Sequence, residues 1–183
     1  ANLVLRASNL ASLQSSVAAG GGIAEAVEIV STVDLGAADE LLQISDSAAD
    51  FVTVLGNGNV GIGITNPQHA LDIQGAYYSR MVVKGNVSGA VTINWNDGNV
   101  QHITLAGNTT LAFTGGQSGG RYVLVVKQDT IGGRTLAWPT SARFPGGATF
   151  NVTPNAGRTD YLGFLYNGVD AKYDNVAFSA AFF

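Results

Sequence analysis

The distal half of the chain, from Val87 to Phe183, reads as short apolar runs separated by turns rich in glycine, asparagine and aspartate. Turn signals that recur about every eight to twelve residues, with no helical stretch between them, are typical of a β-sandwich or barrel. We therefore predict a mainly β chain that ends in an antiparallel β-sandwich. The predicted strands include Val91–Trp95, Val100–Leu105, Thr109–Phe113 and Arg121–Gln128.

Composition divides the chain near Gly75. Residues 1–74 contain eight acidic residues and one basic residue, whereas residues 75–183 contain five acidic and eight basic residues. Phe51 is the only aromatic residue before Tyr77. Together with the AAGGG break at Ala18–Gly22, this change predicts three parts: an N-terminal arm over residues 1–22, a neck over residues 23–75 and a β-sandwich head domain over residues 76–183.

The neck is rich in glycine and alanine, and a strip with a single aromatic residue cannot fill a core of its own. Its alternating apolar residues, Val60, Ile62 and Ile64, therefore need a partner surface. Identical chains wound around one axis would supply that surface, so we expect these residues to line an oligomeric neck. In the arm, residues 2–17 fit a short helix with a narrow apolar seam or a flexible segment. At the start of the neck, Ile23–Val30 fits a helix or a strand.

Within the head domain, Arg121–Gln128 is apolar on both faces, which predicts a central strand. We expect the core to form around this strand and Trp138. The segment Tyr161–Tyr173 predicts a hairpin that turns at Asn167-Gly168, a pair favoured in type I′ turns.

The last residues, Ala177–Phe183, predict a final strand or a contact with a neighbouring subunit. Burial of Phe178, Phe182 and Phe183 is expected, because an exposed apolar terminus favours aggregation.

No combination of residues predicts catalysis or cofactor binding. Cysteine is absent, which excludes disulfides and thiolate chemistry. The segment Gly56–Gly61 matches G-x-G-x-x-G, but Gly63 and Pro67 oppose the helix that a dinucleotide site requires. His69 and His102 are far apart and lack metal-ligand spacing. We expect no cofactor, no metal, no membrane insertion and, since the basic excess is small and scattered, no nucleic acid.

Two groups of segments resemble bacteriophage fibre proteins. GNVGIGITNP (Gly58–Pro67), followed by the short LDI run, is similar to shaft segments of phage tail fibres. In the distal block, GNVQHITLAGNTTLAF, GGRYVLVVKQ, GGRTLAWP and FPGG resemble the β-sandwich ends of tail- and head-fibre proteins. The resemblance implies a homotrimer with a short intertwined β neck, made in the host cytoplasm and located on the virion surface.

The resemblance further implies a non-enzymatic structural protein: a short head fibre, a capsid decoration protein or a fibre module, joined to a capsid or tail protein through the arm. The alternative is a tail-fibre tip that recognises a host surface polysaccharide. Its candidate glycan contacts are Tyr77, Tyr78, Tyr166 and Tyr173. A less favoured hypothesis is a small glycan hydrolase with a carboxylate pair. The distal block offers Asp97, Asp129, Asp160, Asp170 and Asp174, most of them at or beside predicted turns.

Overall fold

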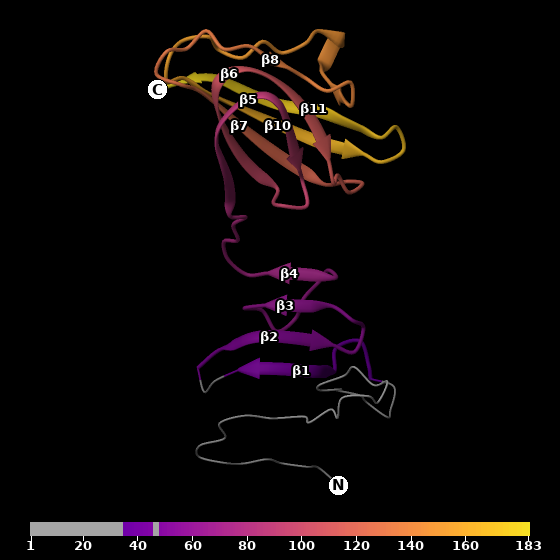
Figure 1. Cartoon of the computed structure of the whole chain (residues 1–183). Coiled ribbons are helices and arrows are strands. Elements are labelled where there is room, and N and C mark those ends of the chain that lie inside the picture. Colours follow the sequence, from indigo (N-terminus) through magenta and orange to yellow (C-terminus); the bar gives the residue numbers. More distant parts are fainter. Residues whose placement is uncertain (1–34, 46–47) are drawn as a thin grey trace, which may run out of the picture. The chain divides into compact units, whose positions relative to one another are not determined.

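The computed structural model describes residues 35–45 and 48–183, which form two units divided between Tyr77 and Tyr78 (Figure 1). Each unit contains its own β-sheet. The predictions made for residues 2–17 and for Ile23–Val30 lie outside the described residues.

The first unit contains a four-stranded sheet in sequence order. Antiparallel pairing joins the first three strands, and the fourth pairs parallel with the third. The strands are β1 (Glu40–Ser45), β2 (Asp50–Leu55), β3 (Val60–Ile62) and β4 (Leu71–Ile73).

A tight turn joins β2 to β3. Gly58 has a φ of 84°, a conformation that favours glycine, and the Asn57 side chain accepts a hydrogen bond from the Asn59 N–H at 2.9 Å. The G-x-G-x-x-G match is therefore a turn between two strands.

The second unit is a sandwich-like arrangement of strands, which confirms the predicted mainly β fold. Its sheet has the order β5-β6-β7-β10-β11-β9, and β8 pairs separately with β6. A short 3₁₀ turn, η1 (Pro145–Gly147), follows β9. The strands are β5 (Met81–Asn94), β6 (Val100–Thr114), β7 (Arg121–Gln128), β8 (Leu136–Ala137), β9 (Ala142–Arg143), β10 (Thr159–Asn167) and β11 (Lys172–Phe182).

Strand pairing in the second unit is mixed, whereas the sequence predicted antiparallel pairing throughout. Strand β6 pairs parallel with both β5 and β7, and β9 pairs parallel with β11. The β7–β10 and β10–β11 pairs are antiparallel. Parallel neighbours ordinarily need a connection of about a dozen residues or more, yet only residues 95–99 join β5 to β6.

Strands β5 and β6 pair parallel despite this short connection because each reverses direction along its own length. Figure 1 shows the two strands as nested arches. The first half of β6 pairs with β7 and the second half pairs with β8, so each arch crosses from one layer to the other. Gly89 has a φ of 68° at the bend of β5. At the bend of β6, a Cβ on Gly107 would lie 2.9 Å from Ser88 Cβ, so glycine allows the two arches to nest.

The core of the second unit lies between these layers, and β7 crosses its middle as predicted. Leu124 in β7 is fully buried. Trp95, rather than Trp138, takes the central position: it is 3% exposed and its ring lies 4.7 Å from that of Tyr122. Trp138 is partly buried at the margin, where its indole N–H donates a hydrogen bond to the Phe150 carbonyl at 2.7 Å.

The predicted hairpin is formed by β10 and β11, but its turn differs from the prediction. Asn167 pairs with Lys172, so residues 168–171 form the loop. The Asn167 side chain accepts hydrogen bonds from the N–H groups of Val169 and Asp170, and Ala171 adopts a φ of 54°. These local hydrogen bonds favour the longer loop over the two-residue type I′ turn.

Strand β11 continues to Phe182, which confirms the predicted last strand. The expected burial of Phe178, Phe182 and Phe183 is not found within one copy of the chain, and burial against a neighbouring subunit stays a prediction. Phe178 is 61% exposed although its ring lies 5.2 Å from that of Phe150, and Phe183, which follows β11, is fully exposed although the Arg158 guanidinium lies 3.1 Å from its ring centre.

Candidate functional site

One face of the sheet in the first unit consists of aliphatic side chains. Residues that pair directly across the strands point to the same side of the sheet. The register therefore aligns two rows across all four strands. We call this surface the apolar neck face; its rows are Leu42, Val54, Val60 and Leu71, and Ile44, Val52, Ile62 and Ile73.

The chain itself covers part of the opposite face. Thr53, Gly61 and Pro67 are buried there, and the Asn59 side chain donates a hydrogen bond to the Pro67 carbonyl at 3.0 Å. A Cβ on Gly61 would collide with the carbonyl oxygen of Ile64, so Ile64 lies on this side. The chain thus covers this face around Thr53 and Gly61, while Gln43 and Phe51 on the same side stay exposed.

Of the three predicted neck residues, the structure aligns Val60 and Ile62 and separates Ile64 from them. Strand β3 ends at Ile62, and Gly63, with a φ of 71°, turns the chain to the other face. The six further members of the apolar neck face are missed by the sequence analysis. The sequence feature that could have identified them is the alternation of apolar residues within LLQIS, FVTVL and LDI.

The apolar neck face is open to solvent among the described residues. Ile44 is 51% exposed, Ile62 39% and Leu71 59%. Contiguous exposed apolar surface of this kind is typical of protein–protein contacts. The face is therefore the candidate assembly site of the first unit.

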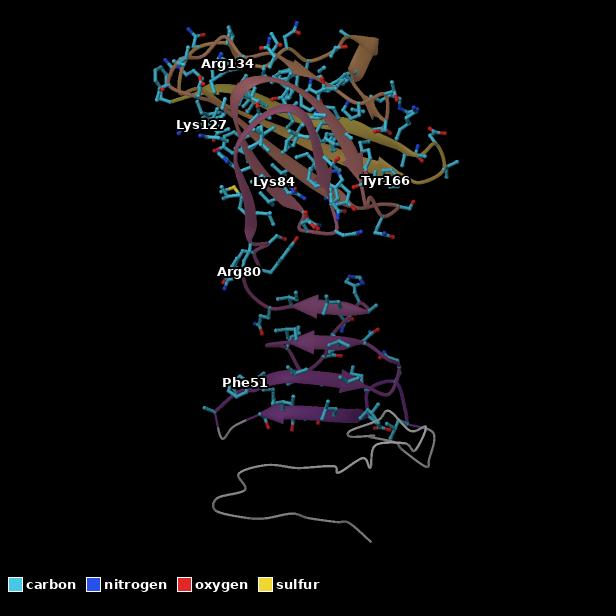
Figure 2. The ribbon with its side chains drawn as sticks, in the orientation of Figure 1. Phe51, Arg80, Lys84, Lys127, Arg134 and Tyr166 are labelled. Atoms are coloured by element: carbon cyan, nitrogen blue, oxygen red, sulfur yellow. The ribbon has the colours of Figure 1, made fainter. Side chains whose placement is uncertain are left out.

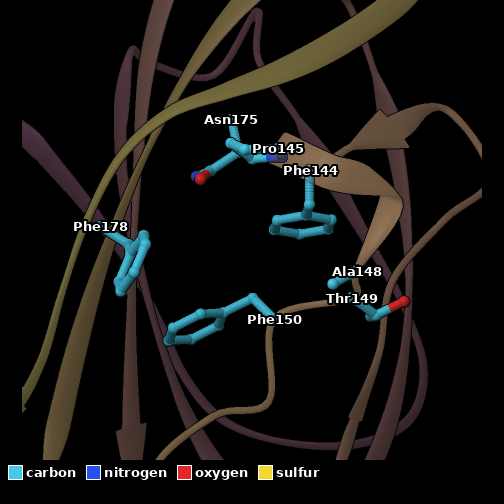
Figure 3. A pocket seen from close by; sticks show the side chains of 7 residues that line it. All are labelled: Phe144, Pro145, Ala148, Thr149, Phe150, Asn175 and Phe178. Atoms are coloured by element: carbon cyan, nitrogen blue, oxygen red, sulfur yellow. The ribbon is translucent and has the colours of Figure 1, made fainter.

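The second unit carries a different feature, a cleft of about 220 Å³ beside β11 (Figure 3). Aromatic rings form most of its wall, and the rings of Phe150 and Phe178 lie 5.2 Å apart. We call it the aromatic cleft; its lining residues are Phe144, Pro145, Ala148, Thr149, Phe150, Asn175 and Phe178.

Asn175 is the polar anchor of the aromatic cleft. It is 7% exposed, and its amide N–H group donates hydrogen bonds to the carbonyls of Gly163 and Ala177, both at 3.1 Å. Its Oδ1 accepts no hydrogen bond from residues 35–45 or 48–183. The Thr149 hydroxyl points away from the cleft centre in Figure 3.

A charged cluster adjoins the aromatic cleft. The Arg143 guanidinium contacts the Asp174 carboxylate at 2.6 and 2.9 Å and the Asp170 carboxylate at 3.1 Å. These hydrogen bonds hold the pKa of Asp174 below its usual value. A second hollow of about 230 Å³, lined by Arg143 and Asp174, shares Phe144, Pro145 and Asn175 with the cleft.

The ion pairs of the second unit predict a loss of stability in acid. The carboxyl groups of Asp129 and Asp174 have pKa values lowered by hydrogen bonds from Arg134 and Arg143. The unfolded chain, with ordinary values of about 3.9, therefore binds protons first as the pH falls. We expect the thermal midpoint to decline below about pH 4. Calorimetry should show a shallower decline of the thermal midpoint with falling pH for Arg143→Gln, because Asp174 then loses its ion-pair partner. Arg121→Gln is the control, because the Arg121 guanidinium lies outside these ion pairs. Equal slopes for the two variants would contradict the assignment.

The structure does not bring the four predicted tyrosines together. Tyr77 and Tyr78 are both 79% exposed and lie at the boundary between the units. Tyr166, labelled in Figure 2, is half-buried and packs 4.6 Å from Tyr173. Tyr173 is a core residue whose hydroxyl accepts a hydrogen bond from the Gly116 N–H at 3.0 Å, and burial raises its pKa.

The five aspartates of the hydrolase hypothesis are engaged in local interactions. Asp97 pairs with Lys84 and Asp129 with Arg134, two basic residues labelled in Figure 2. Buried Asp160 accepts hydrogen bonds from the Thr153 N–H and hydroxyl, while Asp170 and Asp174 share Arg143.

The two histidines lie in different units. His69 is exposed in the β3–β4 connection, and His102 is half-buried in β6, where burial lowers its pKa. No set of three or more histidine, aspartate or glutamate side chains in the described part of the chain could hold a metal ion. The described residues include no helix that is long and apolar enough to cross a membrane.

Residues 86–171, just under half of the chain, match the family model described as "Putative phage tail fibre C-terminal domain". The match supports a phage fibre-type structural protein that is a virion component, and it points away from an enzyme. The neck segment Gly58–Pro67 lies outside the matched residues. Comparisons with curated proteins and with solved structures find no match.

Proposed function

We propose that the chain is the subunit of a short homotrimeric fibre or decoration structure on the surface of a phage particle. The observation that carries this proposal is the apolar neck face, which eight aliphatic side chains form on one side of the sheet. Contact between copies would remove this surface from water, and each fully buried valine, leucine or isoleucine contributes about 1.5–3 kcal/mol.

The number of copies is an inference from the resemblance to phage fibres. Three apolar neck faces around one axis would form a shared core, while the arm of residues 1–22 would join a capsid or tail protein. Three head domains would then present identical surfaces, and weak contacts would add through effective concentration.

Light scattering tests the oligomer directly. We expect the full chain at micromolar concentration to have three times its monomer mass. A fragment of residues 77–183 is expected to be monomeric, because it retains its own core and lacks the apolar neck face. A monomeric full chain would overturn the proposal, and a trimeric fragment would move the interface to the head domain.

The location on the particle needs a separate experiment. Electron micrographs of particles labelled with a gold-conjugated antibody against the chain distinguish head from tail. Particles that lack the protein are expected to assemble, because a projecting fibre does not close a shell. A failure to assemble would contradict the surface location.

A second candidate function is a receptor-binding tip that recognises a host surface glycan. The aromatic cleft supports this candidate, because concave sites with aromatic walls and a few placed polar groups are typical of ligand binding. Loss of host adsorption by particles without the protein would favour the tip, and unchanged adsorption would favour decoration alone.

A further inference from the structure

The aromatic cleft combines an apolar wall with one side-chain acceptor to which no described residue donates a hydrogen bond. Phe150 and Phe178 supply aromatic faces, and Asn175 Oδ1 remains available because both N–H bonds of that amide are already used. Asn175 Oδ1 is not among the fully buried unpaired side-chain atoms of the described residues, so it meets solvent in the open cleft, and a ligand N–H donor would replace water there.

The size and polarity of the cleft limit what can enter. A volume of about 220 Å³ is small for a whole organic ligand and suits a single substituent or ring. A fully hydroxylated sugar ring would bring several donors into a wall with one acceptor, and its remaining hydroxyl groups would lose hydrogen bonds to water. An occupant with one N–H donor and an apolar methyl group matches the cleft better.

We propose that the aromatic cleft binds the acetamido group of an N-acetylhexosamine unit in a glycan. The methyl group packs against Phe150 and Phe178, and the amide N–H donates a hydrogen bond to Asn175 Oδ1. The sugar ring then lies over the adjoining hollow, where its hydroxyl groups donate to the Asp174 carboxylate and accept from the Arg143 guanidinium.

This assignment deepens the receptor-tip candidate and rests on the proposed function for its biological role. Its chemistry is independent of oligomeric state, since all the residues named belong to one copy of the second unit. An experiment can therefore reject the cleft assignment without rejecting the fibre assignment, and the reverse.

Two disaccharides with the same linkage test the ligand class on the full chain. N,N′-diacetylchitobiose carries the acetamido groups, and cellobiose carries hydroxyl groups in their place. We expect calorimetric or NMR titration to detect chitobiose binding, with cellobiose at least about tenfold weaker. Equal binding of both, or no chitobiose binding at all, would overturn the proposal without involving any variant.

Two phenylalanines of β11 give a matched pair of variants for the location. Phe178 lines the cleft and is 61% exposed, whereas Phe182 is 49% exposed and lies outside the cleft. Phe178→Ala is expected to weaken chitobiose binding at least about tenfold, and Phe182→Ala should leave it within about twofold. Equal effects of the two changes would place the ligand elsewhere. Light scattering on the same samples reports the oligomer, so a failed cleft assignment and a failed fibre assignment give different results.

Discussion

Ile44→Lys is expected to convert the full chain from an oligomer to a monomer at micromolar concentration. Ile44 belongs to the apolar neck face and is 51% exposed in the isolated chain, so the monomer should tolerate lysine there. In the oligomer the ammonium group would be buried without a partner, at a cost of several kcal/mol per copy. Light scattering or sedimentation velocity would measure the change.

Gln43→Lys is the matched control, because Gln43 precedes Ile44 and points to the other side of the same strand. Both variants add one positive charge to an acidic part of the chain, so like-charge repulsion between copies cannot explain a difference. If the oligomer persists in Ile44→Lys, or if both variants dissociate it equally, the apolar neck face is excluded as the contact surface.

Leu124→Ala should lower the free energy of unfolding of the head domain by about 2–5 kcal/mol, the usual cost of a cavity at a fully buried leucine. Leu124 is 0% exposed in β7, which pairs with β6 on one side and β10 on the other. The surrounding layer cannot collapse easily onto the cavity, because side chains of both arches meet there. Chemical denaturation followed by tryptophan fluorescence would measure the loss.

Lys127→Ala in the same strand is the control and should change the free energy of unfolding little. Lys127 is exposed and labelled in Figure 2, so its ammonium group reaches solvent from the edge of the unit. Small and equal shifts of the two denaturation midpoints would contradict the central place of β7.

The strands themselves could be predicted from local sequence, but their three-dimensional pairing could not. Alternation and turn residues identify β7, the β10–β11 hairpin and the short strands of the first unit. The bends at Gly89 and Gly107 have the same sequence signature as hairpin turns, so local pattern cannot distinguish an arch between layers from a turn within one sheet. The mixed pairing therefore emerges only from tertiary contacts.

The candidate sites were predictable to different degrees. The alternation at Val60 and Ile62 pointed to the apolar neck face, although the turn at Gly63 removed Ile64 from it. The aromatic cleft was missed, because its walls come from Phe150 before β10 and Phe178 in β11, and no sequence spacing relates them. Tyr173 illustrates the opposite error: a tyrosine beside a turn suggested a surface contact, yet its ring completes the core.

The nested arches have a consequence for how the head domain opens. One half of β5 and one half of β6 lie in each layer. Separation of the layers therefore requires both strands to lose pairing at their bends. Neither layer can melt alone while the other stays intact, so local unfolding has few low-energy routes. The head domain should therefore behave as a single cooperative unit under thermal or mechanical load.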